Sequence, residues 1–132
     1  LSSIIIWYFR NLNIDDLALL RHENLPAAQR SEVILQALRQ VGKAYDFNFD
    51  VRTTDRIVCS ELVYHSYVHL EWPTERYLGR VTISPDNVAV RATRTGPLTT
   101  VLLYHDGNEV LPDRGEAMEQ LVSAQVVKLA RR

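Results

Sequence analysis

The stretch from Gly42 to Leu70 constrains the fold most, because it holds the only cysteine of the chain, Cys59, at the predicted start of an amphipathic helix. Cys59 shares a stripe with apolar residues at the three- and four-residue spacing of one helix face: Leu62, Val63, Tyr67 and Leu70. We expect this stripe to be buried and the helix to stop before Pro73. A thiol at a helix N-terminus lies among unpaired N–H groups and the positive end of the helix dipole, which favour the thiolate. The position suits a thiol nucleophile, and the alternative is a small buried side chain.

An alternation of aromatic and polar residues precedes this helix, in the run Y-D-F-N-F-D from Tyr45 to Asp50. In an extended segment the aromatic side chains would lie on one side and the polar ones on the other. The D-x-N-x-D spacing also copies the opening of a calcium-binding loop. The sixth position holds Val51 rather than Gly, and the twelfth holds Ile57 rather than Glu. Without the sharp turn and the bidentate ligand, we do not expect calcium binding.

Three motifs in this region resemble the YiiX/YebB-like branch of the NlpC-type cell-wall hydrolases: G-K-A-Y-D-F-N-F from Gly42, D-R at Asp55, and C-S-E-L-V-Y from Cys59. The similarity covers most of the chain, from about residue 15 to residue 103. It includes three further runs: D-L-A-L-L-R at 16–21, S-P-D-N-V at 84–88 and L-T-T-V at 98–101.

The resemblance implies an α+β fold, a circularly permuted papain-like domain in which helices pack on a small antiparallel sheet. It implies Cys59 as the nucleophile of a thiol hydrolase that cleaves amide bonds through an acyl-enzyme, with peptidoglycan-type peptides as substrates and no cofactor. It also implies that Tyr45 lies near the cysteine, where its hydroxyl could bind a substrate amine or orient the site. A packed aromatic with a satisfied hydroxyl is the alternative interpretation of Tyr45.

A cysteine nucleophile needs a base, usually histidine, and the chain has four histidines. His65 and His69 follow Cys59 at six and ten positions on the predicted helix, so they point away from it. His22 follows a predicted strand and reads as a surface turn residue. His105 ends another strand, where it flanks a turn or, less simply, serves as the base.

In the YiiX-like family the histidine precedes the cysteine, on a strand with an H-x-G type motif. Nothing from Leu1 to Asp16 matches that motif, and the chain opens on Leu rather than Met. We therefore expect the C-terminal part of a longer hydrolase domain, with the base supplied by a missing N-terminal segment or by a second chain. The rival hypothesis is a non-catalytic binding module that keeps a papain-like groove without a base.

Glu61, His65 and His69 form an i, i+4, i+8 row that could present zinc ligands on one helix face. The row lacks the H-E-x-x-H order, nothing supports the third ligand, and such rows are commonly solvated. We expect no metal site.

The remaining pattern is that of one soluble-type domain spanning residues 1–132, with 46% apolar and 23% charged residues. A net charge of -1 gives no reason to expect binding to nucleic acid or to an anionic membrane. The longest apolar run, Ile4–Phe9, favours a strand and is too short to span a bilayer. The compartment, bacterial cytoplasm or cell envelope, cannot be predicted.

Other elements are predicted from periodicity and from start and stop residues. They comprise a strand at 17–21, a helix from Pro26 closed by Gly42, a surface connection at 71–80, a short helix from Ser84 to Val90, a strand at 98–104 with a turn at Asp106-Gly107, and a terminal helix through Met118–Leu129.

Overall fold

The computed structural model describes residues 16–130, with side chains as far as residue 124. The strand predicted at Ile4–Phe9 lies outside the described residues. Backbone contacts divide the chain into two compact units. The first combines the residues up to Glu23 with those from Ala92 onward, and the second comprises Asn24–Arg91.

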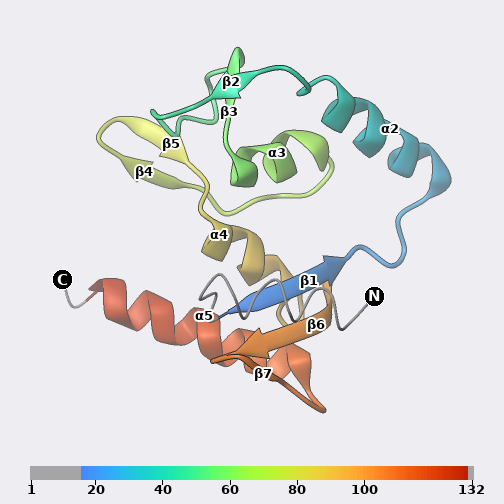
Figure 1. Ribbon diagram of the computed structural model, residues 1–132, viewed down its shortest axis with the longest axis vertical. Helices are drawn as coiled ribbons and strands as arrows, with labels where there is room; N and C mark the ends of the chain where they lie inside the picture. The colour runs from blue at the N-terminus through green and yellow to red at the C-terminus, as the bar shows by residue number, and fades with distance from the viewer. Residues whose placement is uncertain (1–15, 131–132) are drawn as a thin grey trace. The chain divides into compact units, whose positions relative to one another are not determined.

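The first unit is built on an antiparallel sheet in the order β1-β6-β7, and one helix packs on it (Figure 1). Its elements are β1 (Leu17–Arg21), β6 (Thr99–His105), β7 (Asn108–Glu109) and α5 (Arg114–Ala130). The register of β1 and β6 runs from Leu17 opposite Tyr104 to Arg21 opposite Thr99, with an irregularity between Leu19 and Leu20. The predicted strands and the predicted terminal helix are confirmed. The strands form where β-branched and apolar runs suit a half-buried pleated surface.

The turn between β6 and β7 is the predicted Asp106-Gly107 pair, with φ values of 48° and 73°. Positive φ at both central residues is what a two-residue hairpin of type I′ requires, and Asp-Gly is one of its preferred sequences. The core of this unit is mostly apolar and contains Ala92, Leu98, Thr100, Leu103 and Met118. The Thr100 hydroxyl is satisfied by donating to the carbonyl of Ala92 at 3.1 Å.

The second unit consists of three helices and two short strand pairs, and the strand pairs lie to one side of α3 (Figure 1). Its elements are α2 (Ala27–Leu38), β2 (Ala44–Tyr45), β3 (Arg56–Ile57), α3 (Cys59–Ser66), β4 (Glu75–Tyr77), β5 (Arg80–Thr82) and α4 (Pro85–Ala89), which a 3-10 turn at Val90–Ala92 follows. Strands β2 and β3 are parallel, whereas β4 and β5 form an antiparallel hairpin. Helix α3 packs against α2 and α4.

Two helix starts follow the sequence signals, whereas the predicted stop of α2 at Gly42 is wrong. Ser84 caps α4 by accepting the Asn87 N–H at 3.1 Å, and Pro85 takes the first helical position, as predicted. Pro26 lies at the N-cap of α2. Gly42 has a φ of 84°, the left-handed conformation expected of it, although α2 already ends at Leu38 and turns lead on to Gly42.

The structure corrects two expectations about α3. The helix ends at Ser66 rather than just before Pro73, and Tyr67, at φ -99° and ψ 59°, leaves the helical conformation. The chain then folds back, because the Tyr67 carbonyl accepts the Leu70 N–H and the Trp72 indole N–H. The buried residues of α3 are polar, namely Ser60, Glu61 and Ser66, whereas Leu62 on the expected buried stripe is exposed.

The connection at 71–80 also differs from its prediction, since β4, the hairpin turn and the first residue of β5 lie in it. Its two-residue turn is Leu78-Gly79, with φ values of 48° and 78°. Leucine is an unusual choice for a left-handed position, so the first of the two residues carries no turn signal.

Candidate active site

Cys59 is the first residue of α3, and its side chain is exposed. The residue before it, Val58, is the N-cap in an extended conformation, and its carbonyl accepts the Leu62 N–H at 3.0 Å. The prediction that Cys59 begins a helix is therefore confirmed. Its thiol lies at the end of α3 where backbone N–H groups lack intrahelical acceptors and the helix dipole is positive.

The parallel pair of β2 and β3 brings Tyr45 alongside the segment that enters α3. Tyr45 pairs with Ile57, and the Ile57 carbonyl accepts the Asp46 N–H at 3.2 Å. Cys59 follows Ile57 by two residues, a span of at most about 7 Å of chain. Tyr45 is exposed, and the two sequence-predicted site residues come from adjacent segments of the same unit.

The Tyr45–Asp50 run reverses the usual distribution of apolar and charged side chains. Tyr45, Phe47 and Phe49 are exposed, with ring centroids 4.8 Å apart for Tyr45–Phe47 and 6.4 Å for Tyr45–Phe49. Asp46 is fully buried, and its carboxylate accepts the N–H groups of Asn48 at 2.8 Å and Asp50 at 3.3 Å. Asp46, which resembled a calcium ligand, thus organises a turn. The three exposed rings form an aromatic surface, and Tyr45 in it pairs with Ile57 just before α3 begins.

Two arginines hold this turn against the β4–β5 hairpin. Arg52 forms a bidentate pair with Asp50, at 2.9 and 2.7 Å, and also donates to the Gly79 carbonyl at 2.9 Å. Arg80 donates in the opposite direction, to the Asn48 carbonyl at 3.1 Å. The hydrogen bonds from Arg52 hold the pKa of Asp50 well below its usual value. The turn is therefore cross-linked by charge-assisted hydrogen bonds.

The two residues that follow Cys59 on α3 are polar and buried. The Ser60 hydroxyl donates to the carbonyl of Ile83 at 2.7 Å. Glu61 accepts the Val58 N–H at 3.0 Å, which is the acidic half of a capping box. Val58 has no side-chain acceptor to complete the box, so the motif lacks its usual Ser or Thr. Glu61 was weighed from the sequence only as a zinc ligand, and its position three residues after the N-cap was the signal for a capping function.

The histidines of the second unit lie away from the start of α3. His65 is in the last turn, half-buried, with its ring 5.2 Å from that of Tyr64. Burial lowers the pKa of His65, and the nearby charge of Lys43 adds to the effect. His69 lies beyond the helix end, so Glu61, His65 and His69 do not share one helix face. Within residues 16–130, no group of three His, Cys, Asp or Glu side chains is placed to hold a metal ion.

His105 belongs to the first unit, where both ring nitrogens lie near carboxylates. Its Nδ1 is 2.5 Å from Asp16 Oδ1, and its Nε2 is 3.6 Å from Asp106 Oδ2. The hydrogen bond to Asp16 raises the pKa of His105, and Asp106 contributes further. His22 follows β1 in the same unit.

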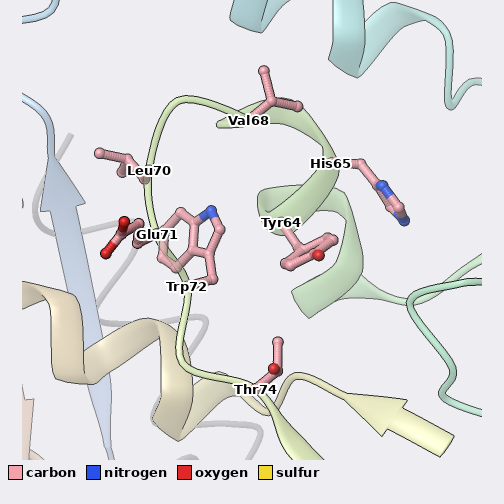
Figure 2. Close-up of a pocket in the computed structure, with 7 residues that line it drawn as sticks. All are labelled: Tyr64, His65, Val68, Leu70, Glu71, Trp72 and Thr74. Carbon is pink, nitrogen blue, oxygen red and sulfur yellow. The ribbon is translucent and has the colours of Figure 1, made fainter.

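A pocket of about 370 Å³ lies at the C-terminal end of α3. Tyr64 and Trp72 lie on opposite sides of its opening, with Thr74 below them (Figure 2). The Trp72 indole is fixed by its hydrogen bond to the Tyr67 carbonyl at 3.1 Å. Cys59 does not line this pocket, which is formed by the last turn of α3 and the following loop.

An exposed cysteine at the first residue of a helix, in a chain of helices and small sheets, is compatible with a thiol hydrolase. A family model described as permuted papain-like amidase enzyme, YaeF/YiiX, C92 family, matches residues 8–128, and the chain belongs to this family. Membership confirms the predicted family, the permuted papain-like fold and, in general terms, a cysteine amidase that acts on peptide or amide bonds.

Comparison with curated proteins and with solved structures gives no match. Within the described part of the chain, no helix combines the length and apolar character needed to cross a bilayer.

Proposed function

We propose that Cys59 is the nucleophile of this amidase. The thiolate attacks the carbonyl carbon of an amide, and backbone N–H groups at the start of α3 stabilise the resulting oxyanion. The C–N bond then breaks, the amine leaves with a proton, and water hydrolyses the thioester to release the acid and the thiol. The observation that carries the proposal is the exposure of Cys59 at the first residue of α3.

Tyr45 is proposed to bind the substrate amine or to orient the site through its hydroxyl. Its support is the β2–β3 register, which brings an exposed tyrosine alongside the residues just before Cys59. The resemblance to cell-wall hydrolases makes peptidoglycan-type peptides the proposed substrate class.

The base is proposed to come from another segment or a second chain. Within the second unit, His65 and His69 lie at or beyond the end of α3 that is opposite Cys59. The same observation supports the second candidate function, a binding module that keeps the cysteine and the aromatic surface but does not hydrolyse amides.

Alkylation of the thiol separates the two functions. Cys59 is the only cysteine, so the mass added by iodoacetamide reports on one site. An activated nucleophile should react faster in the folded protein than in denaturing urea at about pH 6.5, where an ordinary thiol with a pKa of about 8.5 is almost entirely protonated. Equal rates in the two states would favour the binding module.

Hydrolysis of peptidoglycan-derived peptides is then measured with the chain alone and with added polypeptides that could supply the catalytic base. Cys59→Ala should abolish turnover, and Tyr45→Phe should lower it while leaving alkylation of Cys59 unchanged. Turnover that survives in Cys59→Ala would remove Cys59 from the reaction.

A further inference from the structure

Glu61 lies two residues after the proposed nucleophile on α3, and its surroundings are unusual for a carboxyl group. At this spacing the two side chains point in different directions from the helix. Cys59 is exposed, whereas Glu61 is only 1% exposed. Its Oε2 accepts the N–H of Val58, the residue just before Cys59, at 3.0 Å. The carboxyl therefore holds the peptide group through which the chain enters α3.

The other carboxyl oxygen, Oε1, is buried and has no hydrogen-bond partner. The charged groups that act on Glu61 are the carboxylates of Asp46 and Asp50, and both disfavour a third negative charge. The guanidinium of Arg52, two residues after Asp50, already forms the bidentate pair with Asp50. An ionised Glu61 would be a desolvated charge without a counter-ion, which is strongly unfavourable.

The direction of the shift in the pKa of Glu61 agrees with this geometry. Burial raises the pKa, the Val58 N–H opposes the shift in part, and the charges of Asp46 and Asp50 raise the pKa further. A neutral carboxyl can still accept the Val58 N–H through its carbonyl oxygen.

We propose that Glu61 is a positioning residue for Cys59, held as the neutral acid so that it caps the start of α3 without adding a negative charge near the thiolate. The inference rests on the proposed function of Cys59. An ionised carboxylate would make the same hydrogen bond to Val58, but its charge would oppose ionisation of the thiol. The neutral acid keeps the hydrogen bond to the Val58 N–H and adds no negative charge near the thiol.

Two substitutions separate the geometric and the electrostatic parts of the proposal. Glu61→Gln keeps an acceptor for the Val58 N–H and is neutral at every pH, so the pH profile of Cys59 alkylation should match that of the wild type. Glu61→Ala removes the acceptor, and alkylation at about pH 6.5 should slow about three- to tenfold, the equivalent of one lost hydrogen bond. Glu32→Ala, on the exposed surface of α2, is the matched control and should have no effect.

The outcomes that overturn the proposal are distinct. If Glu61→Gln reacts faster than the wild type at low pH, Glu61 is ionised in the native protein. If Glu61→Ala reacts like the wild type, Glu61 does not position the cysteine. Should the alanine variant fail to fold, Glu61→Leu, which fills the same space without an acceptor, takes its place.

A second measurement, the hydrogen exchange of the Val58 amide, does not depend on the thiol. Protection should be kept in Glu61→Gln and lost in Glu61→Leu, and protection that persists in the leucine variant overturns the proposal. If wild-type Cys59 alkylates no faster in the folded protein than in urea, the proposed function fails, and the amide exchange still decides whether Glu61 fixes the start of α3.

Discussion

His105 and Asp16 form the clearest pH-sensitive contact of the first unit. The hydrogen bond between Nδ1 and the Asp16 carboxylate favours the charged imidazolium, and Asp106 near Nε2 acts in the same direction. The pKa of His105 is therefore raised above its ordinary value of 6.5. A group whose pKa is higher in the folded state stabilises the fold below its unfolded pKa, and this stabilisation is lost as the pH rises through the folded value.

We predict that His105→Gln lowers the free energy of unfolding more at about pH 5.5 than at about pH 8.5. The difference should be on the order of 0.5 kcal/mol, because both side chains are about half exposed and water screens the pair. Urea unfolding at the two pH values measures it. Asp16→Asn should remove the same pH dependence. If the difference in free energy of unfolding between the wild type and His105→Gln is the same at both pH values, the assignment is contradicted.

The two hairpins have turns of the same length and backbone conformation, but different residues occupy the first turn position. Both have two-residue turns with positive φ at each position, Asp106-Gly107 between β6 and β7 and Leu78-Gly79 between β4 and β5. A left-handed conformation costs a residue such as leucine about 1–2 kcal/mol, whereas Asn and Asp tolerate it better. Leu78 is 79% exposed, so little burial compensates for this cost.

We predict that Leu78→Asn stabilises the protein by about 0.5–1 kcal/mol, because Asn-Gly is the preferred type I′ sequence. Thermal or urea unfolding of the variant checks the gain. Leu78→Ala is the control, since alanine removes the same exposed side chain but keeps the unfavourable left-handed backbone. Equal stability of the asparagine and alanine variants would show that the turn backbone does not limit stability here.

Elements with local signals could be predicted from the sequence, whereas elements set by tertiary contacts could not. The Ser84-Pro85 start of α4 and the Asp106-Gly107 turn depend on residues within a few positions, and both were found. The end of α3 depends on the Tyr67 carbonyl, which Trp72 and Leu70 bind from the following loop. The apolar periodicity of α3 continued past that point, so the helix was predicted too long.

The parts of the candidate site that lie in a sequence motif could be predicted, whereas the parts that depend on the burial of a side chain could not. The helix start at Cys59 was predicted from the sequence and is confirmed, whereas the roles of Cys59 and Tyr45 stay predictions. Glu61 has the same sequence context as a surface carboxylate, and its burial is visible only in the structure. Helical periodicity predicted that the apolar side chains of α3 are buried, yet Leu62 is exposed. Ser60 is buried instead, and its hydroxyl is satisfied by a hydrogen bond to the carbonyl of Ile83.

The two units differ in what they bury. In the second unit, polar side chains are as prominent inside as apolar ones: Asp46, Ser60, Glu61, Ser66 and Asn87 beside Leu25, Val51, Val58 and Ile83. The buried Asp46 and Ser60 side chains are hydrogen-bonded to the backbone, so the stability of this unit should respond to the loss of single polar partners. The first unit buries mainly apolar side chains, with Leu103 on its central strand only 2% exposed. Its stability should respond instead to lost volume.

Leu103→Ala tests this view of the first unit. Removal of the buried leucine side chain leaves a cavity beneath the central strand and should cost about 2–5 kcal/mol, depending on how far the neighbours relax. Hydrogen exchange should report the change as lower protection of the β1 and β6 amides, which pair in one ladder. Leu19→Ala is the matched control, because Leu19 lies on β1 in the same sheet but is 52% exposed. If the two alanine variants lose protection equally, packing behind β6 does not determine the stability of the sheet, and the strand hydrogen bonds must carry it instead.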